Sequence, residues 1–235
     1  MSGILRPLIL AFFTLGLLGS ASNASSKSRT RNDAGTVGAI ELRKTVDCIV
    51  ERDPRRAARL LTTRPQSPDE VRVAEGLHGT ISNCMTGYVD SLTAGYTEMR
   101  GFIAEVFYLR ENPSEPDFTL LKHEEVPLPA DWVPDRRYQN EVVSMYMLKF
   151  GSCVTAADPK DVSALIRTEV RSDEELGAIN RLKPSLSGCL EKGFTFRLDA
   201  AILRALTAQS LYRSLAIWRT PQAAMIPSTN PGKSN

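Results

Sequence analysis

The stretch that decides the fold occurs twice. "CIVERDP" begins at Cys48, and "CVTAADP" begins at Cys153. When residues 48–84 are placed over residues 153–189 without a gap, ten of the 37 positions are identical, and each copy ends on a second cysteine. Further on, "RGFIAEVFY" (100–108) corresponds to "RALTAQSLY" (204–212). Such self-similarity predicts a duplicated structural unit.

Helix-start signals lie at the same places in both copies. The Asp-Pro pairs at Asp53 and Asp158 are typical of helix starts, because Asp caps the exposed amides and proline loses no needed donor. "SPDE" and "SDEE" fit the capping box, in which Ser and Glu bond reciprocally to first-turn amides. The predicted caps are Asp53, Ser67, Glu70, Asp158, Ser172 and Glu175.

Apolar residues follow each box at helical spacing, as in Val71, Ala74, Leu77 and Ile81. The segments from Arg100 and from Arg204 carry similar stripes, and strand-like alternation is scarce. The sequence therefore predicts an all-α fold of two pseudo-symmetric four-helix repeats, joined by a Pro-rich extended connector.

The N-terminus predicts export. Its apolar run of twelve residues, "LILAFFTLGLLG" (8–19), follows a single cation and precedes small residues at Ser22 and Ala24, as in a secretory signal peptide. The alternative is an uncleaved anchor, but a spanning helix needs about 20 apolar residues. We expect a periplasmic or extracellular protein with no membrane span after cleavage near Ser25.

Export favours disulfides for an even number of cysteines. The equal 36-residue spacings predict the pairs Cys48–Cys84 and Cys153–Cys189. The alternative is a four-thiolate metal site, but such sites normally use cysteines two to four residues apart. Each disulfide would stabilise a small helical unit, by about 3–4 kcal/mol in the chain-entropy model.

The duplication sets the expected organisation. We expect a signal peptide (1–24), a flexible polar lead (25–37), repeat 1 (38–110), a connector (111–140), repeat 2 (141–219) and a disordered tail (220–235). The connector holds five prolines, but it is apolar enough to lie across the helices as a clasp rather than as a solvated linker. One domain is preferred to two.

The search for catalytic groups is mostly negative. The sequence has no G-x-S-x-G elbow, no phosphate loop and no H-E-x-x-H motif. His78 and His123 are the only histidines, and each is more typical of a surface residue than of a ligand. A net charge of only +2 and the absence of a basic stripe argue against nucleic acid as a partner. We expect no cofactor and no metal, and lean towards a protein that is not an enzyme.

Two residue pairs remain after capping and disulfides are assigned. They are Arg100/Arg204 and Tyr108/Tyr212, on the closing helix of each copy, where Glu105 also corresponds to Gln209. One interpretation is packing, with a bonded tyrosine hydroxyl and a paired arginine. The other is a polar-rimmed groove between the copies that takes a protein, a peptide or an amphipathic ligand.

These motifs resemble those of exported α-proteobacterial proteins of two helical repeats with no assigned function. The shared pattern is C-[IV]-x₄-D-P, a capping box, a second cysteine 36 residues after the first, and a closing R-x₃-A-x₃-Y helix, over most of residues 40–216. The resemblance implies export, helical repeats and paired disulfides, and no activity. We therefore expect a non-catalytic binding or structural module. The alternative is a cell-envelope hydrolase or a small-ligand carrier with a site between the repeats.

Overall fold

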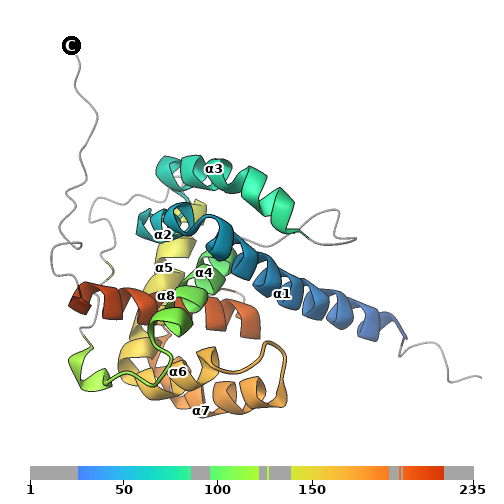
Figure 1. Ribbon diagram of the computed structural model, residues 1–235. Helices are drawn as coiled ribbons and strands as arrows, with labels where there is room; N and C mark the ends of the chain where they lie inside the picture. Colours follow the sequence, from blue (N-terminus) through green and yellow to red (C-terminus); the bar gives the residue numbers. More distant parts are fainter. Residues whose placement is uncertain are drawn as a thin grey trace, which may run out of the picture. The chain divides into compact units, whose positions relative to one another are not determined.

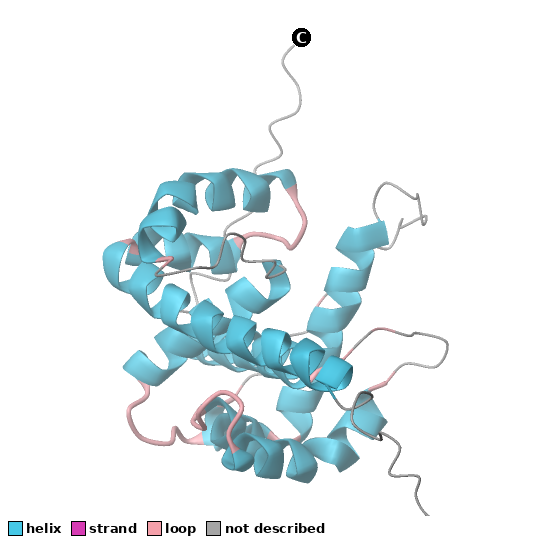
Figure 2. Ribbon diagram, turned by 90° about the vertical axis from the view of Figure 1, so that its right-hand side faces the viewer, coloured by secondary structure: helices cyan, strands magenta, loops and turns pink. Residues whose placement is uncertain are grey.

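The computed structural model describes residues 26–85, 96–121, 126, 139–190, 196 and 198–219. In these ranges it consists of helices without any strand, which confirms the all-α prediction (Figure 2). The helices are α1 (Ser26–Arg52), α2 (Pro54–Thr62), α3 (Pro68–Cys84), α4 (Tyr96–Glu111), the 3₁₀ helix η1 (Phe118–Leu120), α5 (Gln139–Ala157), α6 (Pro159–Ile166), α7 (Asp173–Cys189) and α8 (Ala200–Arg219).

The chain divides into two units, and the second carries the fold. Residues up to Gly35 form one unit, and residues from Thr36 onward form the other, compact one, which is described below. Within it, α2 and α3 lie at one end and α6 and α7 at the other, with α4 and α8 crossing between them (Figure 1). The order of the helices α1–α4 is thus repeated by α5–α8.

The predicted caps form as the sequence indicates. The side chain of Asp53 accepts a hydrogen bond from the amide of Arg56, and Asp158 accepts one from Asp161. Ser67 caps α3 and Ser172 caps α7 in the same way, through the amides three residues later.

The glutamates of the two boxes bind one residue earlier than a standard capping box predicts. Glu70 Oε2 accepts from the amide of Gln66 (2.5 Å), and Glu175 Oε2 accepts from that of Arg171 (2.8 Å). Gln66 and Arg171 are also the positive-φ residues other than glycine in the described ranges, at 60° and 69°. The glutamates therefore stabilise a left-handed turn before each helix, a conformation that costs non-glycine residues energy.

Both predicted disulfides are present. Cys48–Cys84 joins α1 to α3 with a Cα–Cα distance of 5.6 Å, and Cys153–Cys189 joins α5 to α7 at 5.7 Å. No described cysteine is free. Each copy therefore has its first and third helices covalently linked.

Two hydrophobic cores meet at the crossing of α4 and α8. One core is formed mainly by α1–α4 and the other by α5–α8, but Tyr108 of α4 belongs to the second core. The pair α4 and α8 has the most extensive packing in the described chain. At their crossing, a Cβ on Gly101 would lie 2.2 Å from both Cα and Cβ of Ala205. Only glycine allows this approach.

One expectation about the buried faces was wrong. Val71 was predicted to belong to the apolar stripe, but its exposed fraction is 41%, and that of Leu176, at the equivalent position of the second copy, is 58%. The buried face of α3 instead begins at Glu70 and continues through Val73, Ala74 and Leu77. Because Glu70 occupies the inward position, the next residue is rotated about 100° away from the core.

Several expectations lie wholly or partly outside the described residues. The signal peptide, most of the connector and the tail are among them, as is His123. Helix α1 begins at Ser26, so it includes most of the segment expected to be a polar lead. None of the described helices has the length and apolar character required to cross a membrane.

Candidate functional site

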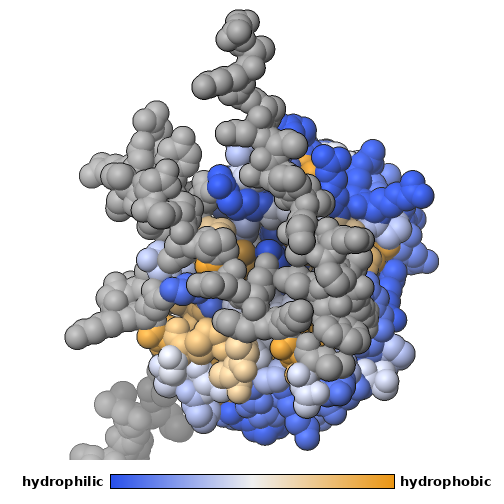
Figure 3. Space-filling model, turned by 90° about the vertical axis from the view of Figure 1, so that its left-hand side faces the viewer, coloured by the Kyte–Doolittle hydropathy of each residue, from blue (hydrophilic) through white to orange (hydrophobic). Residues whose placement is uncertain are grey.

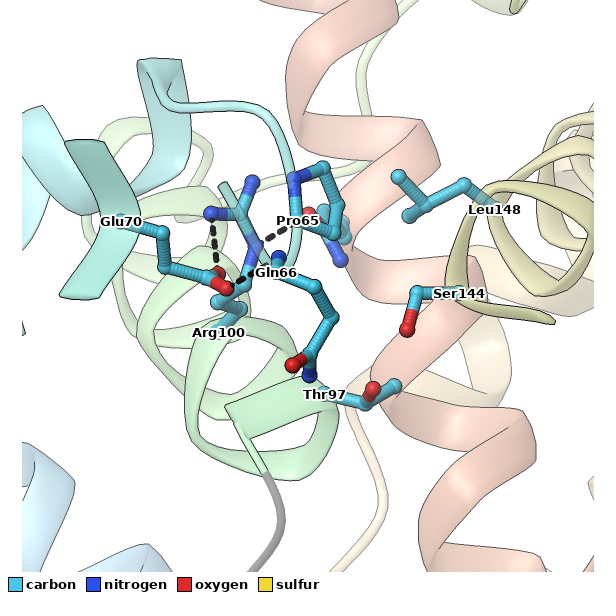
Figure 4. Close-up of a pocket in the computed structure, with 8 residues that line it drawn as sticks. Pro65, Gln66, Glu70, Thr97, Arg100, Ser144 and Leu148 are labelled. Atoms are coloured by element: carbon cyan, nitrogen blue, oxygen red, sulfur yellow. Dashed lines mark hydrogen bonds and ion pairs between the residues drawn. The ribbon is translucent and has the colours of Figure 1, made fainter. Parts of the chain in front are cut away.

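The residues shared by the two copies converge on two buried arginines. Arg100 of α4 is 1% exposed, and its guanidinium lies against the C-terminal end of α2. Its Nη1 donates to Leu60 O (2.6 Å), to Thr63 Oγ1 (2.9 Å) and to Glu70 Oε1 (2.9 Å). Its Nη2 donates to Thr63 O (3.0 Å). We call this arrangement the first arginine cradle, of which Figure 4 shows Arg100 and Glu70.

Arg204 of α8, also 1% exposed, lies in an equivalent second cradle. Its Nη1 donates to Thr168 Oγ1 and to Glu175 Oε1, both at 3.1 Å. Its Nη2 donates to the carbonyl oxygens of Ile166 (2.8 Å) and Thr168 (2.6 Å) at the end of α6. Guanidinium donors thus satisfy carbonyls that a helix end leaves unpaired, and Arg can do so because it carries five donors in a fixed plane.

Each cradle is completed by the closing helix of the other copy. Arg100 Nε donates to Gln209 Oε1 of α8 (3.0 Å). Arg204 donates to Glu105 of α4 through Nε (2.7 Å) and Nη2 (2.9 Å), a bidentate pair. Since Glu105 and Gln209 occupy equivalent positions, the two copies exchange the same contact in both directions. This reciprocal exchange links the interiors of the two repeats.

The two contacts differ in charge, because Glu105 is an anion and Gln209 is neutral. The residues beside these two acceptors differ in charge as well. Glu105 also binds Arg43 Nε (2.9 Å) of α1. Extending the alignment five residues towards the N-terminus places Leu148 at the position of Arg43. Leu148 and Gln209 line the same small space. Glu105, the charged acceptor, therefore has Arg43 beside it as a further cation. Gln209, the neutral acceptor, has Leu148 beside it instead.

Burial shapes the protonation of these arginines. Burial lowers the pKa of Arg100 to about 10, against the attraction of Glu70, so the group stays charged at neutral pH. For Arg43, burial also acts to lower the pKa, but Asp47 and Glu105 outweigh it and the pKa is raised. Asp47 forms a close ion pair with Arg43. These carboxylates therefore offset part of the cost of burying the charged guanidinium groups.

The two tyrosines differ in their surroundings. Tyr108 is fully buried, and its hydroxyl lies 2.7 Å from Ser163 Oγ on α6 of the other copy. Tyr212 is half-buried, stacks on Phe107 with ring centroids 5.8 Å apart, and donates to Glu111 (3.3 Å). Tyr108 therefore adds a further bond between the copies, besides the two arginine contacts.

The arrangement agrees with packing rather than with an open groove. Arg100, Tyr108 and Arg204 are buried and hydrogen-bonded, and Tyr212 lies at the edge of both cores. The space beside Arg100 and Gln209 measures about 10 Å³ (Figure 4). That is room for about one water molecule and not for a peptide or ligand. The expected groove is filled because the guanidinium groups turn inward to the helix ends.

A larger cavity lies in the second repeat instead. It has a volume of about 230 Å³ and lies between α5 and the end of α7, with Phe196 on a third side. Phe150 and Phe196 meet edge to face, with centroids 5.2 Å apart. The lining residues are Tyr146, Lys149, Phe150, Cys153, Gly188, Cys189, Leu190 and Phe196.

Hydrophilic side chains cover much of the described surface. Figure 3 shows one face of the molecule, on which a small hydrophobic area lies among hydrophilic residues. His78 is exposed on α3, and its neighbour on that helix, Glu75, is exposed as well. Within the described ranges, His, Cys, Asp and Glu form no group of three or more that is suited to a metal ion.

Sequence reasoning identified the members of the cradles without their connections. Glu70 and Glu175 were predicted only as caps. No role was predicted for Arg43 or for Thr63 and Thr168, which are identical between the copies. The signal was available, since Thr, Glu and Arg recur together at equivalent positions although capping requires only the glutamate.

Comparisons with known proteins found no similarity: the chain matches no family model, no curated protein and no solved structure. The resemblance to exported α-proteobacterial repeat proteins therefore stays a prediction.

Proposed function

We propose that the protein is an exported, disulfide-linked helical module that acts in binding or in structure rather than in catalysis. The observation that carries this proposal is that the polar residues shared by the two copies are buried and bind one another. Arg100, Arg204 and their glutamates are buried and satisfy one another and the helix ends. The duplication has thus kept polar groups that hold the interior together.

Export is supported by two kinds of observation. The two disulfides suit an oxidising compartment. The apolar run 8–19 and the small residues after it have the layout of a signal peptide. Mass analysis of secreted or periplasmic protein should find a chain that begins near Ser25 and holds both disulfides. An intact Met1 in a membrane fraction would contradict export.

The non-catalytic role can be tested by comparing function with stability. In a strain that lacks the gene, variants of exposed ionisable residues, such as His78→Ala and Glu75→Gln, should restore the phenotype as well as the natural sequence does. Cradle variants should lose function only in proportion to their fall in melting temperature. An ionisable residue whose replacement abolishes function at unchanged melting temperature would favour the hydrolase alternative.

A small-ligand carrier is the second candidate, and the 230 Å³ cavity favours it. A cavity of about 150 Å³ can bind benzene, so this one has room for a somewhat larger apolar group. Its position differs from the earlier expectation, because it lies within the second repeat. Indole and octanoate are suitable probes. Saturable binding of either, lost in Phe196→Trp, would support this role, and no binding at millimolar concentration would exclude it.

A further inference from the structure

The two disulfides are equivalent in sequence but differ in their surroundings. Cys84 is only 3% exposed and belongs to the core of the first repeat, and Cys48 packs against that core. Cys153 and Cys189 are both half-buried, and both line the 230 Å³ cavity. Cys48 is half-buried as well, so the two links differ at their second cysteines and in the cavity: Cys84 is buried, whereas Cys189 is half-buried and borders an open space.

The described residues next to Cys189 in the sequence are exposed. Cys189 is the last residue of α7, and its neighbour Leu190 is 53% exposed. Gly188, on the other side, is exposed, and a Cβ added there would meet nothing within 4 Å. Cys153 lies inside α5 beside the fully buried Val154. Among the described residues, Cys189 therefore has more exposed neighbours than Cys153.

The walls of this cavity are specific to the second copy. In the first copy, Glu41 is aligned with Tyr146 and Thr45 is aligned with Phe150. Lys149 is retained as Lys44, which pairs with Glu41 at 2.9 Å. In the second copy the residue aligned with Glu41 is Tyr146, so an aromatic ring lines the cavity where the first copy has a carboxylate.

We propose that Cys153–Cys189 is a thiol–disulfide exchange site that reacts with a dithiol, and that Cys48–Cys84 is structural. A thiolate of the dithiol attacks Cys189 Sγ, the S–S bond breaks, and Cys153 leaves as a thiolate and takes up a proton. The second thiol of the dithiol then attacks the mixed disulfide. The dithiol is oxidised by two electrons to a disulfide, and Cys153 and Cys189 become two thiols. This inference does not depend on the proposed binding role.

The experiment follows both links in one molecule. The folded, oxidised full chain is treated with dithiothreitol for graded times, quenched with acid, labelled with N-ethylmaleimide and digested with trypsin. The four cysteines fall in separate peptides, because a cleavable Lys or Arg separates each from the next. We expect the peptides of Cys153 and Cys189 to be labelled roughly tenfold faster than those of Cys48 and Cys84.

Two glycine variants test whether the cavity controls the reaction. Gly188→Leu adds a side chain at the cavity and should slow reduction of Cys153–Cys189 several-fold, without changing the rate for Cys48–Cys84. Gly79→Leu is the matched control, because Gly79 also has open space around its Cβ but lies on α3. It should change neither rate.

Three results would overturn the proposal. Equal rates for both links would mean that reduction occurs only through global unfolding. Faster reduction of Cys48–Cys84 than of Cys153–Cys189 would show that the reactive disulfide lies in the first copy. An unchanged rate for Cys153–Cys189 in Gly188→Leu would show that the thiol does not enter through the cavity.

Discussion

At the residue scale, the interior depends on charged groups that sequence patterns assign to the surface. Arg100 and Arg204 are each 1% exposed, and each has a carboxylate within 3.1 Å. A buried ion pair gives little net stability compared with apolar residues, but removal of one partner leaves an uncompensated charge. The cradles therefore specify the arrangement of the helices, and single substitutions in them should be costly.

The pairing of Glu105 with Arg43 can be tested by replacing both residues with those at the equivalent positions of the second copy, which are Gln209 and Leu148. Glu105→Gln should lower the free energy of unfolding by about 2–3 kcal/mol, since Arg43 and Arg204 both lose a charged acceptor. Adding Arg43→Leu reproduces the combination of Leu148 and Gln209. The double variant should recover about 1 kcal/mol or more in a double-mutant cycle measured by urea unfolding. Strict additivity of the two changes would contradict the matched-pair interpretation.

Glu98 gives a prediction about pH. Burial raises the pKa of Glu98, a bond from its own backbone opposes this, and the charge of Asp199 adds to the rise. The folded state then binds the proton more tightly than the unfolded state does, so this contribution to stability is present at low pH and is lost as pH rises through the raised pKa. Glu98→Gln should therefore raise the melting temperature at pH 7 but have little effect near about pH 3.5, below the unfolded value. An equal effect at both pH values would show that charge is not the cause.

At the element scale, the close crossing of α4 and α8 determines the register of the two cradles. Gly101 and Ala205 occupy equivalent positions, and their backbones approach more closely than any larger residue would permit. One turn or so away on each helix, Glu105 and Gln209 reach the arginine of the other copy. A wider crossing would separate these pairs.

Gly101→Ala should therefore be destabilising, although alanine is the better helix former. Its Cβ would lie 2.2 Å from atoms of Ala205, so we expect a loss of about 1–3 kcal/mol or more from overpacking. Gly79→Ala on the open face of α3 is the matched control and should stabilise by about 0.5–1 kcal/mol. Urea unfolding of both variants gives the two values. A gain in stability for Gly101→Ala would mean that the helices are not in close contact.

The elements were more predictable than the contacts between them. Asp53 and Ser67 act on their own neighbours, so the caps could be inferred from local spacing. The same holds for the disulfides, because equal spacing within a repeat limits the pairing. By contrast, Arg100 meets Gln209 across 109 positions of sequence, and nothing local indicates that its side chain turns inward. Local chemistry predicted the helices, whereas the cradles required the three-dimensional arrangement.

At the scale of the whole molecule, each repeat is incomplete without the other. Tyr108 of the first repeat belongs to the core of the second, and each arginine takes one acceptor from the opposite closing helix. The compact unit from Thr36 onward includes both repeats. We expect this unit to unfold as one cooperative structure despite its internal duplication.

Native-state hydrogen exchange of Arg204→Lys tests this central claim most directly. Lysine keeps the charge but loses the bidentate geometry, so the second cradle and its bond to Glu105 are weakened. The slowest amides of a protein report its global unfolding free energy. If the two repeats unfold together, the slowest amides of α4, in the first repeat, lose as much protection as those of α8. Loss of protection in α5–α8 alone, with α4 unchanged, would contradict it.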